Sequence, residues 1–419
     1  MSDLSPHVPD GWQLTPLSEV GKGIRGVGYE PERDLVSGDE SDSTRLLRAN
    51  NVADGVLNFD EIQRVRSAVV RDDQYLRDGD IVICGANGSK RLVGKAALFK
   101  SQLGRRYTFG AFMNCFRTDP TKASPDFVYQ LFQSDQYRRH VELALSGSSI
   151  NNLSSKQVAA FAFPIPELPE QLTIASALSD ADRLIECLER LIVKKRNVKK
   201  GTAQALLSGA LRLPGHGDEW QEYRLGDFGN TYAGLTGKTG SDFGIGESKF
   251  VTFMNVIGNT RLDPTLVQTV NLLPGESQNR VLEGDLLFNG SSETPTEVGF
   301  ASAVTEPLEE VYLNSFCFGF RPHPNSELDP LYFAYWTRSG TGRRILDVLA
   351  QGSTRYNISK RALLGATFVC PPLSEQRVIA EVLTDMDAEI EALEKRLAKT
   401  RDLKTGMAQE LLSGRTRLV

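Results

Sequence analysis

Positively charged side chains gather in one segment of the sequence, and phosphate is the group they suit best. Between Asn87 and Arg117 there are seven lysines and arginines and no aspartate or glutamate. These cations are Lys90, Arg91, Lys95, Lys100, Arg105, Arg106 and Arg117. Such a run neutralises the phosphates of a nucleic acid and gives affinity that does not depend on base sequence. The nearby side chains of Asn87, Ser89 and Asn114 carry polar groups that can reach base edges.

A second basic segment lies between Arg338 and Arg361, where six cations face the single acid Asp347. The loop that starts at Asn289 carries Glu293 and Glu297 instead of cations, and a carboxylate there can accept a hydrogen bond from cytosine. We therefore expect a DNA-binding surface. Its predicted residues are Asn87, Ser89, Lys90, Arg91, Lys95, Arg105, Arg106, Ser148, Asn151, Asn289, Ser292, Glu293, Arg355, Tyr356 and Lys360. Taken alone, the same charges also fit a solvated basic surface that binds nothing.

Catalytic motifs are incomplete throughout the sequence. Gly237-Lys238-Thr239 resembles the end of a phosphate-binding loop, but that motif needs a glycine where Tyr232 stands. Glu247 and Lys249, with Asp242 upstream, resemble a fragment of a metal-dependent nuclease, but their spacing is too tight. We therefore expect no catalytic residues and a protein that leaves chemistry to its partners.

Composition narrows the class of protein further. The chain has 419 residues and a formal net charge of −5, which excludes a generally basic, histone-like protein but allows local basic faces. Five scattered cysteines without a CxxC pair and four dispersed histidines predict neither disulfides, nor a metal site, nor a cofactor. Without a signal peptide or an apolar run of about 20 residues, we expect a cytoplasmic protein that does not enter the membrane.

The elements that must position these residues occur twice. Residues 166–213 and 371–418 match at an offset of 205, with about 25 of 48 positions identical. Weaker landmarks repeat ahead of them. Trp12-Gln13 corresponds to Trp220-Gln221, and the Gly-Asp pair at 79–80 corresponds to that at 284–285. Each half thus reads as a variable domain followed by a repeated tail.

The two tails have the apolar spacing of paired helices. Apolar residues alternate at intervals of four and three, which is an a/d seam with a mean spacing near 3.5. The residues predicted to pack the two helices together are Ile174, Leu178, Ile185, Leu188, Ile379, Leu383, Ile390 and Leu393. Two copies of one stripe offer each other a partner, so we expect a coiled coil, whereas an ordinary amphipathic surface helix is the alternative.

The variable domains read as mixed α and β structure. Residues 79–84 and 284–288 are short apolar strands opened by Gly-Asp, and residues 126–132 and 329–336 read as helices. If a two-fold axis relates the halves, the two long helices run antiparallel and hold the domains at a fixed spacing. A protein with two DNA-binding domains at a fixed spacing suits two DNA half-sites about a helical turn apart.

The repeated landmarks together resemble the specificity subunit of Type I restriction–modification systems. They are the Trp-Gln opening, the Gly-Asp strand, a Gly-Ser…Asn element and a Pro-x-Leu-x-Glu-Gln…Asp-x-Asp tail. The resemblance covers nearly the whole chain. It implies two target-recognition domains that each read half of a bipartite double-stranded DNA target. It also implies two methyltransferase subunits and, in the restricting complex, motor-nuclease subunits as partners.

The fold class expected is α+β, with two similar recognition domains and an antiparallel coiled-coil spacer of pseudo-two-fold symmetry. The predicted boundaries are 1–165 for the first recognition domain, 166–213 for the first spacer helix, 214–219 for a linker, 220–370 for the second domain and 371–419 for the second helix. Two other functions stay open at this point: a coiled-coil scaffold that does not read DNA, and a stand-alone nuclease acting through Glu247 and Lys249.

Overall fold

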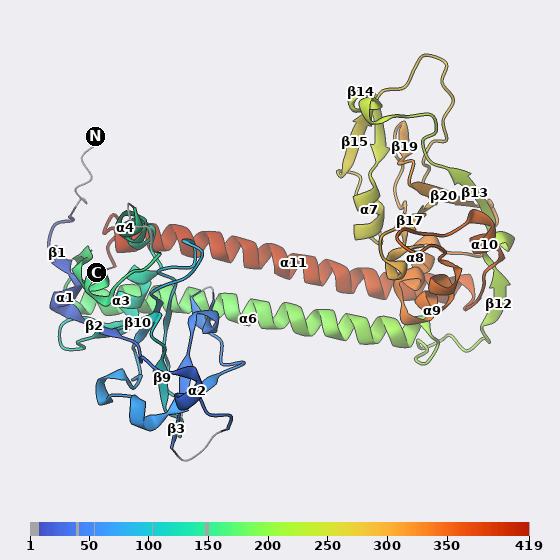
Figure 1. Ribbon diagram of the computed structural model, residues 1–419. Coiled ribbons are helices and arrows are strands. Elements are labelled where there is room, and N and C mark those ends of the chain that lie inside the picture. Colours follow the sequence, from blue (N-terminus) through green and yellow to red (C-terminus); the bar gives the residue numbers. More distant parts are fainter. Residues whose placement is uncertain (1–7, 39–41, 54, 103, 147–150, 419) are drawn as a thin grey trace. The chain divides into compact units, whose positions relative to one another are not determined.

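The chain divides into two compact units, each of which draws on both long helices. The computed structural model describes residues 8–38, 42–53, 55–102, 104–146 and 151–418 (Figure 1). Unit 1 comprises Met1–Glu189 and Lys395–Val419, and unit 2 comprises Arg190–Glu394. Within the described ranges, no helix combines the length and the apolar character needed to cross a membrane.

Unit 1 is built around a four-stranded antiparallel sheet of order β2-β10-β7-β8. The strands are β2 (Gly21–Arg25), β10 (Met113–Thr118), β7 (Ile81–Cys84) and β8 (Ala96–Leu98). Every residue of β7 is buried, because helices cover one face and a second sheet the other. The helices of this unit are α1 (Leu17–Val20), α2 (Pro31–Asp34), α3 (Pro125–Phe132), α4 (Asp135–Leu145) and α5 (Ser155–Ala160).

The second sheet of unit 1 has the order β6-β3-β9, with β3 and β9 parallel. Its strands are β3 (Ser43–Leu47), β6 (Gln63–Arg66) and β9 (Tyr107–Phe109). Two further pairs are β4 (Val52–Ala53) with β5 (Val56–Leu57), and β1 (Gln13–Pro16) with β11 (Ala162–Ile165). The β1–β11 pair brings the beginning of the domain beside the segment that leads into the first long helix.

Unit 2 repeats this topology. Its four-stranded sheet has the order β13-β20-β16-β18, and its three-stranded sheet the order β15-β14-β19 with β14 and β19 parallel. The strands are β12 (Gln221–Arg224), β13 (Gly229–Ala233), β14 (Phe243–Val251), β15 (Val267–Val270), β16 (Leu286–Asn289), β17 (Ser291–Ser292), β18 (Ala301–Ala303), β19 (Val311–Leu313), β20 (Cys317–Pro322), β21 (Tyr356–Asn357) and β22 (Thr367–Cys370). The short helices are α7 (Phe253–Gly258), α8 (Pro330–Arg338), α9 (Gly340–Leu349) and α10 (Lys360–Gly365). The duplication seen in the sequence is therefore a duplication of the fold.

The repeated Gly-Asp motif places a buried aspartate, bound by an arginine, at the start of a central strand in each unit. Asp80 accepts two hydrogen bonds from the Arg117 guanidinium, at 2.8 and 2.6 Å, and a third from the backbone N–H of Arg77. Asp285 accepts the equivalent pair from Arg321, at 2.8 and 2.7 Å. A bidentate arginine stabilises a buried carboxylate that would otherwise be costly to desolvate. The pair joins neighbouring strands, β7 to β10 and β16 to β20.

The two tails form long helices that pair antiparallel inside each unit. They are α6 (Leu168–Leu207) and α11 (Leu373–Leu412), each 40 residues long. In unit 1, Arg401 of α11 pairs with Glu189 and Lys404 pairs with Asp182. In unit 2, Lys195 of α6 pairs with Glu389. In unit 1 a later position on α11 meets an earlier position on α6, so the directions are opposite.

The predicted seam residues serve two purposes. At the outer ends, Ile174 and Leu178 lie in one buried cluster with the core of the first domain, and Ile379 and Leu383 lie in that of the second. These clusters also contain the last turns of the other helix, Leu411 and Leu412 in unit 1 and Leu206 and Leu207 in unit 2. Nearer the middle, Leu188 and Ile390 are buried, while Ile185 and Leu393 are half-buried. The predicted seam residues thus pack the two long helices against each other and also pack each helix against its domain.

The glutamine of the repeated Glu-Gln motif makes the same contacts in both units. The amide of Gln171 accepts a hydrogen bond from the backbone N–H of Ser124, the N-cap of α3, and donates to the carbonyl of Pro166. Gln376 does the same with Asp329, the N-cap of α8, and with Pro371. Each glutamine therefore fastens the start of a long helix to the core of its own domain.

The glutamate beside each glutamine binds the end of the other long helix. Glu170 is 7% exposed and accepts two hydrogen bonds from Arg417, at 2.5 and 2.7 Å. Glu375 is 1% exposed and accepts two from Arg212, both at 2.8 Å. Each arginine also lies against the tryptophan that opens its domain. In each unit this ion pair holds the end of one long helix against the start of the other, although the two residues are far apart in sequence.

We expect the substitution Arg417→Ala to loosen unit 1 and leave unit 2 unchanged. It leaves the buried Glu170 carboxylate without its partner, which is costly in a desolvated site. Amide hydrogen exchange in the first turns of α6 should become about tenfold faster or more, while α11 in unit 2 keeps its protection. Arg212→Ala should do the reverse. Arg415→Ala, which breaks an exposed pair with Glu410, is the matched control and should change neither unit.

Candidate nucleic-acid interface

The predicted polar loops are hairpin connections that close in the same way in both units. The β7–β8 loop (residues 85–95) closes through hydrogen bonds from Gly94 N to Cys84 O and from Cys84 N to Lys95 O, both 2.8 Å. The β16–β18 loop (residues 290–300) closes through the equivalent pair at Asn289. Gly94 and Gly299 have φ values of +86° and +81°, where side chains other than glycine are strained. The loops are therefore anchored rather than free.

An arginine from the helix behind each loop holds the loop by its carbonyls. Arg138 of α4 donates to the carbonyl oxygens of Lys90 and Val93, at 3.1 and 2.9 Å, and pairs with Glu142 four residues later. Arg343 of α9 donates to those of Pro295 and Val298 and pairs with Asp347. The backbone of both loops is thus positioned from the protein side, which leaves their outward side chains available.

The second predicted segment lies directly beside the loop in each unit. In unit 1, Asn151 donates from its amide to Gly88 O at 3.0 Å, and the backbone N–H of Leu153 donates to Gly85 O at 2.7 Å. In unit 2 the contact is a two-residue ladder in which Ser292 pairs with Tyr356. The structure therefore brings together the two segments that the sequence analysis singled out. Ser148 lies outside the described residues.

In unit 1 the predicted loop residues and cations separate into two groups. Ser89, Lys90 and Arg91 are exposed on the β7–β8 loop, with Asn87 and Lys95 half-buried at its ends. Arg105 and Arg106 are exposed on the segment before β9, beside the second sheet.

Arg105 lines a cavity of about 400 Å³ with Arg45, Arg64 and Tyr107, whereas the Arg106 guanidinium stacks 3.6 Å from the Tyr75 ring. Two cations of the same run are paired with acids instead: Lys100 with Asp126 and Arg117 with Asp80. Fewer positive charges are therefore available than the sequence suggests.

In unit 2 several predicted residues hold the structure together. Asn289 is fully buried and its amide donates to Glu297 O and accepts from Ser291 N. Ser292 is 6% exposed and donates to the Glu297 carboxylate. Asn289 and Ser292 therefore shape the loop.

The charged residues predicted beside this loop are more accessible. Glu293 and Arg355 are exposed, and Tyr356 and Lys360 are half-buried. The Arg355 guanidinium lies 5.2 Å from the Phe316 ring, and the Lys360 amine lies 5.9 Å from the Phe318 ring. Unit 2 thus presents one acidic and two basic predicted side chains around its loop.

Arg338, which the charge count included, is structural. Its guanidinium donates to the carbonyls of Val256, Ile257, Asn259 and Ala301. Burial lowers its pKa to about 10. Charge counted along a sequence does not distinguish such an arginine from an exposed one.

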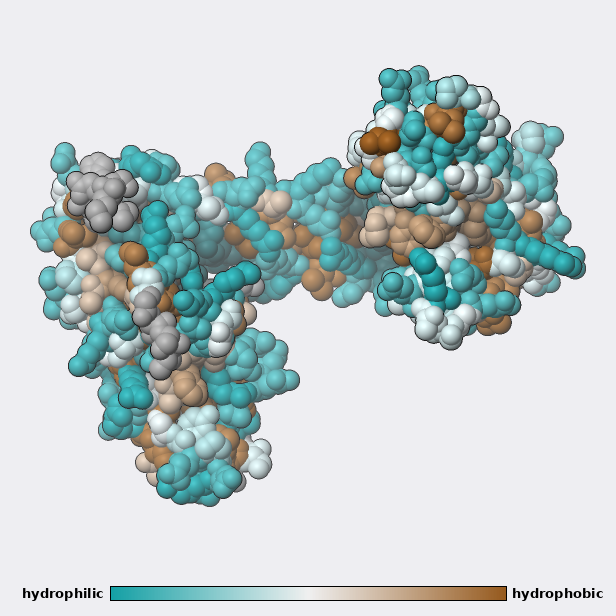
Figure 2. Space-filling view, turned by 45° about the horizontal axis from the view of Figure 1, so that its top comes forward, coloured by the Kyte–Doolittle hydropathy of each residue, from teal (hydrophilic) through white to brown (hydrophobic). Residues whose placement is uncertain are grey.

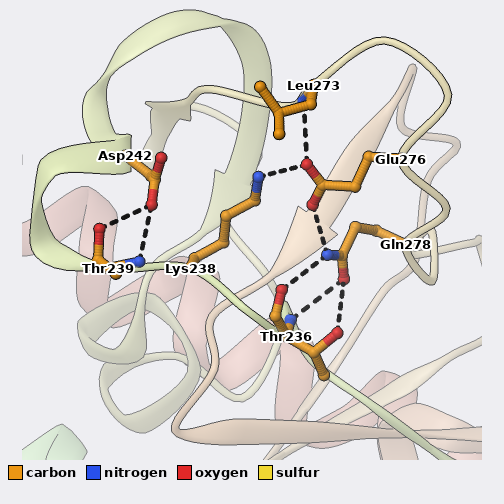
Figure 3. Close-up of polar contacts among 7 residues, drawn as sticks. All are labelled: Thr236, Lys238, Thr239, Asp242, Leu273, Glu276 and Gln278. Atoms are coloured by element: carbon orange, nitrogen blue, oxygen red, sulfur yellow. Dashed lines mark hydrogen bonds and ion pairs between the residues drawn. The ribbon is translucent and has the colours of Figure 1, made fainter.

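Lys238 of the phosphate-loop fragment and Asp242 of the nuclease fragment are engaged in local contacts, as Figure 3 shows, while Glu247 and Lys249 are exposed. Lys238 is 5% exposed at its side chain and forms an ion pair with Glu276 at 2.5 Å, and this hydrogen bond lowers the pKa of Glu276 to about 2. Asp242 accepts hydrogen bonds from the backbone and hydroxyl of Thr239. Within the described part of the chain, no three metal-ligating side chains converge.

Arg138 and Arg343 are the positioning residues that the sequence analysis missed. A signal for them exists: both lie at the repeat offset of 205 and each is followed by an acid four residues later. On a helix that spacing forms an ion pair that fixes the side chain. The signal does not say that the arginine points to the loop, because that depends on how α4 and α9 pack.

We expect Arg138→Leu to release the β7–β8 loop without unfolding unit 1. Hydrogen exchange of its amides should rise about tenfold or more, since charged donors to at least two carbonyls are lost. Arg343→Leu should have the same effect on the β16–β18 loop alone. Arg139→Leu, at an exposed neighbour on α4, is the control. Unchanged exchange in both loops would contradict the positioning role.

Curated relatives cover almost the whole chain. The StySPI type I restriction enzyme specificity subunit of Salmonella potsdam is 26% identical over 97% of this chain and 88% of its own length. The EcoKI type I restriction enzyme specificity subunit of Escherichia coli K12 is 24% identical over the same shares.

Solved structures share the fold at low sequence identity. The HsdS subunit from Thermoanaerobacter tengcongensis aligns with a TM-score of 0.50 and 18% identity over 99% of this chain and all of that one. The type I restriction-modification S subunit from M. genitalium aligns with a TM-score of 0.58 and 16% identity, covering 98% of this chain and 97% of that one.

A family model described as the type I restriction modification DNA specificity domain matches twice, over residues 9–194 and 217–400. Each match takes in one domain with its loop and most of the long helix that follows. Together the two matches account for most of the 419 residues. The chain therefore belongs to the type I restriction-modification DNA specificity family and carries two copies of its domain.

Proposed function

We propose that this chain is the specificity subunit of a type I restriction–modification complex. It reads a bipartite double-stranded DNA target, one half-site with each domain, and has no catalytic residues of its own. Adenine methylation and cleavage belong to partner subunits, two methyltransferases and, in the restricting complex, motor-nucleases. The observation that carries this proposal is the double match to a DNA specificity domain over two units of equal topology.

The proposed DNA-contacting surface of each unit consists of the anchored loop and the segment beside it. Lys90 and Arg91 project from one loop, and Glu293 projects from the other, so the two units offer different chemistry on the same frame. Cations suit phosphates and guanine, whereas a carboxylate suits the cytosine amino group. The half-sites read by the two units should accordingly differ in sequence. Arg105, Arg106, Arg355 and Lys360 fit the role of phosphate contacts that fix the register.

The proposed spacer is the antiparallel pair of α6 and α11. Forty helical residues correspond to about 60 Å of rise, which is enough to set a gap between half-sites. The same helices are the proposed frame on which the methyltransferase subunits dock. We place the complex in the cytoplasm, where it has access to DNA.

The two other functions have less support. A scaffold that does not read DNA leaves the match to DNA specificity domains unexplained. A stand-alone nuclease needs converging metal ligands, and Asp242 is already engaged by Thr239.

Exchanging residues 12–165 for the corresponding part of a relative should change one half-site and leave the other intact. The loop and its neighbouring segment of unit 1 both lie in this range, whereas those of unit 2 do not. Long-read mapping of N6-methyladenine in cells that express the chain with its partner subunits measures this. A change in both half-sites, or in neither, would contradict the proposal that each domain recognises one half-site.

Inserting one heptad at the middle of both α6 and α11 should lengthen the gap by about three base pairs. Seven helical residues add about 10 Å, against about 3.4 Å per base pair, and a heptad keeps the apolar seam in phase. The same methylation map reports the gap. A gap of unchanged length in an active complex would rule out the spacer role, and a four-residue insertion, which breaks the seam, is the control.

A further inference from the structure

One exposed phenylalanine stands at the same place in each unit. Phe112 is 73% exposed and Phe316 is 54% exposed. Among the described residues, every other phenylalanine, tyrosine and tryptophan is buried or half-buried. Phe112 directly precedes β10 and Phe316 directly precedes β20, the equivalent strands of the two four-stranded sheets. The two exposed rings therefore occupy equivalent positions in the two domains.

Each phenylalanine is displayed by a tight turn. The turn of residues 110–113 closes with a hydrogen bond from Met113 N to Gly110 O at 2.8 Å, and that of 314–317 closes from Cys317 N to Asn314 O at 3.1 Å. The phenylalanine is the third residue in both. Turns favour glycine, asparagine or aspartate at such positions, so the turn itself does not require an aromatic ring. The residue after each phenylalanine is buried, which directs the ring outward.

The turn lies beside the anchored loop in each unit, because Met113 pairs with Cys84 and Cys317 pairs with Asn289. The carbonyl oxygen of Phe112 accepts hydrogen bonds from the backbone N–H groups of Gly85 and Ala86, both at 2.9 Å. A Cβ atom on Gly85 would lie 3.1 Å from this oxygen, and one on Gly290 would lie 3.1 Å from the oxygen of Phe316. A side chain at the first position of either loop would crowd this oxygen, which favours glycine there. The ring consequently stands beside the loop in a fixed position.

Cations accompany the rings in both units. The Arg355 guanidinium lies 5.2 Å from the Phe316 ring, and in unit 1 the loop that is hydrogen-bonded to Phe112 carries the exposed Lys90 and Arg91 further along its length. Figure 2 shows a mainly hydrophilic surface on which hydrophobic atoms form separate patches. An exposed aromatic ring among cations is the combination by which proteins hold nucleic acids, with cations at phosphates and the ring against a base.

Resting on the function proposed above, we propose that Phe112 and Phe316 are base-contacting residues, one for each half-site. Each ring packs against the apolar surface of a base in its own half-site, as a thymine methyl contact or a partial wedge between bases. The contact is apolar, so it contributes to the preference for the target and not to the salt-dependent attraction to phosphates. This assigns a specificity role to two residues outside the loops.

The test uses the chain assembled with its methyltransferase subunits and a duplex containing the target found by methylation mapping. Phe112→Ala and Phe316→Ala should each weaken target binding about tenfold, while binding to unrelated DNA and the slope of log K against log salt stay unchanged. Phe112→Tyr keeps the ring and should keep the affinity. Leu143→Ala in unit 1 and Met254→Ala in unit 2 remove other exposed apolar side chains and should have no effect.

A methylation map of each alanine variant should show relaxed preference in one half-site only. The inference fails if the alanine variants bind the target as tightly as the controls, or weaken target and unrelated DNA equally. It also fails if they reduce methyltransferase recovery with the chain, which would make the rings a protein contact. A wild-type complex that does not prefer its mapped target would overturn the proposed function itself, whereas a failure confined to the two phenylalanine variants leaves that function standing.

Discussion

The cross-pairing of Glu170 with Arg417 and of Glu375 with Arg212 is the interaction on which both units depend. Each glutamate sits in the first turn of one long helix and binds an arginine that follows the end of the other. The neighbouring glutamine binds the domain core, so domain, helix start and helix end meet at one buried point. A buried carboxylate without its cation is energetically costly. The two glutamate–arginine pairs therefore fix the register of the antiparallel helices at both ends.

The rest of each unit divides into a constant frame and a variable surface. The constant frame consists of the four-stranded sheet, the Asp–Arg pair at its centre and the helix arginine that holds the loop. The loop side chains differ in charge between the units although their backbones close in the same way. A frame that fixes backbone position while leaving side chains unconstrained allows the DNA preference to change without refolding the domain.

Sequence reasoning captured the features that depend on period and repetition. The strands of 79–84 and 284–288, the helices of 126–132 and 329–336 and the two tails were predicted, because local apolar patterns determine them. The sequence alone overestimates the number of cations that are available to bind DNA. Arg117 is engaged by Asp80, and Arg338 by carbonyls some 80 residues away, and such partners follow only from the tertiary fold. It also missed Phe112 and Phe316, because their significance lies in exposure, which a sequence does not state.

The composition of unit 1 has a consequence for how the chain is made. Unit 2 is one continuous stretch, Arg190–Glu394, whereas unit 1 needs Lys395–Val419 in addition to its first 189 residues. On the ribosome, the segment that supplies Arg417 emerges only after all of unit 2, since 247 positions separate it from Glu170. The domain translated first is therefore completed last, which reverses the usual N-to-C order of domain folding. Until then Glu170 lacks its cation, and the nascent first domain lacks the helix end that completes its core.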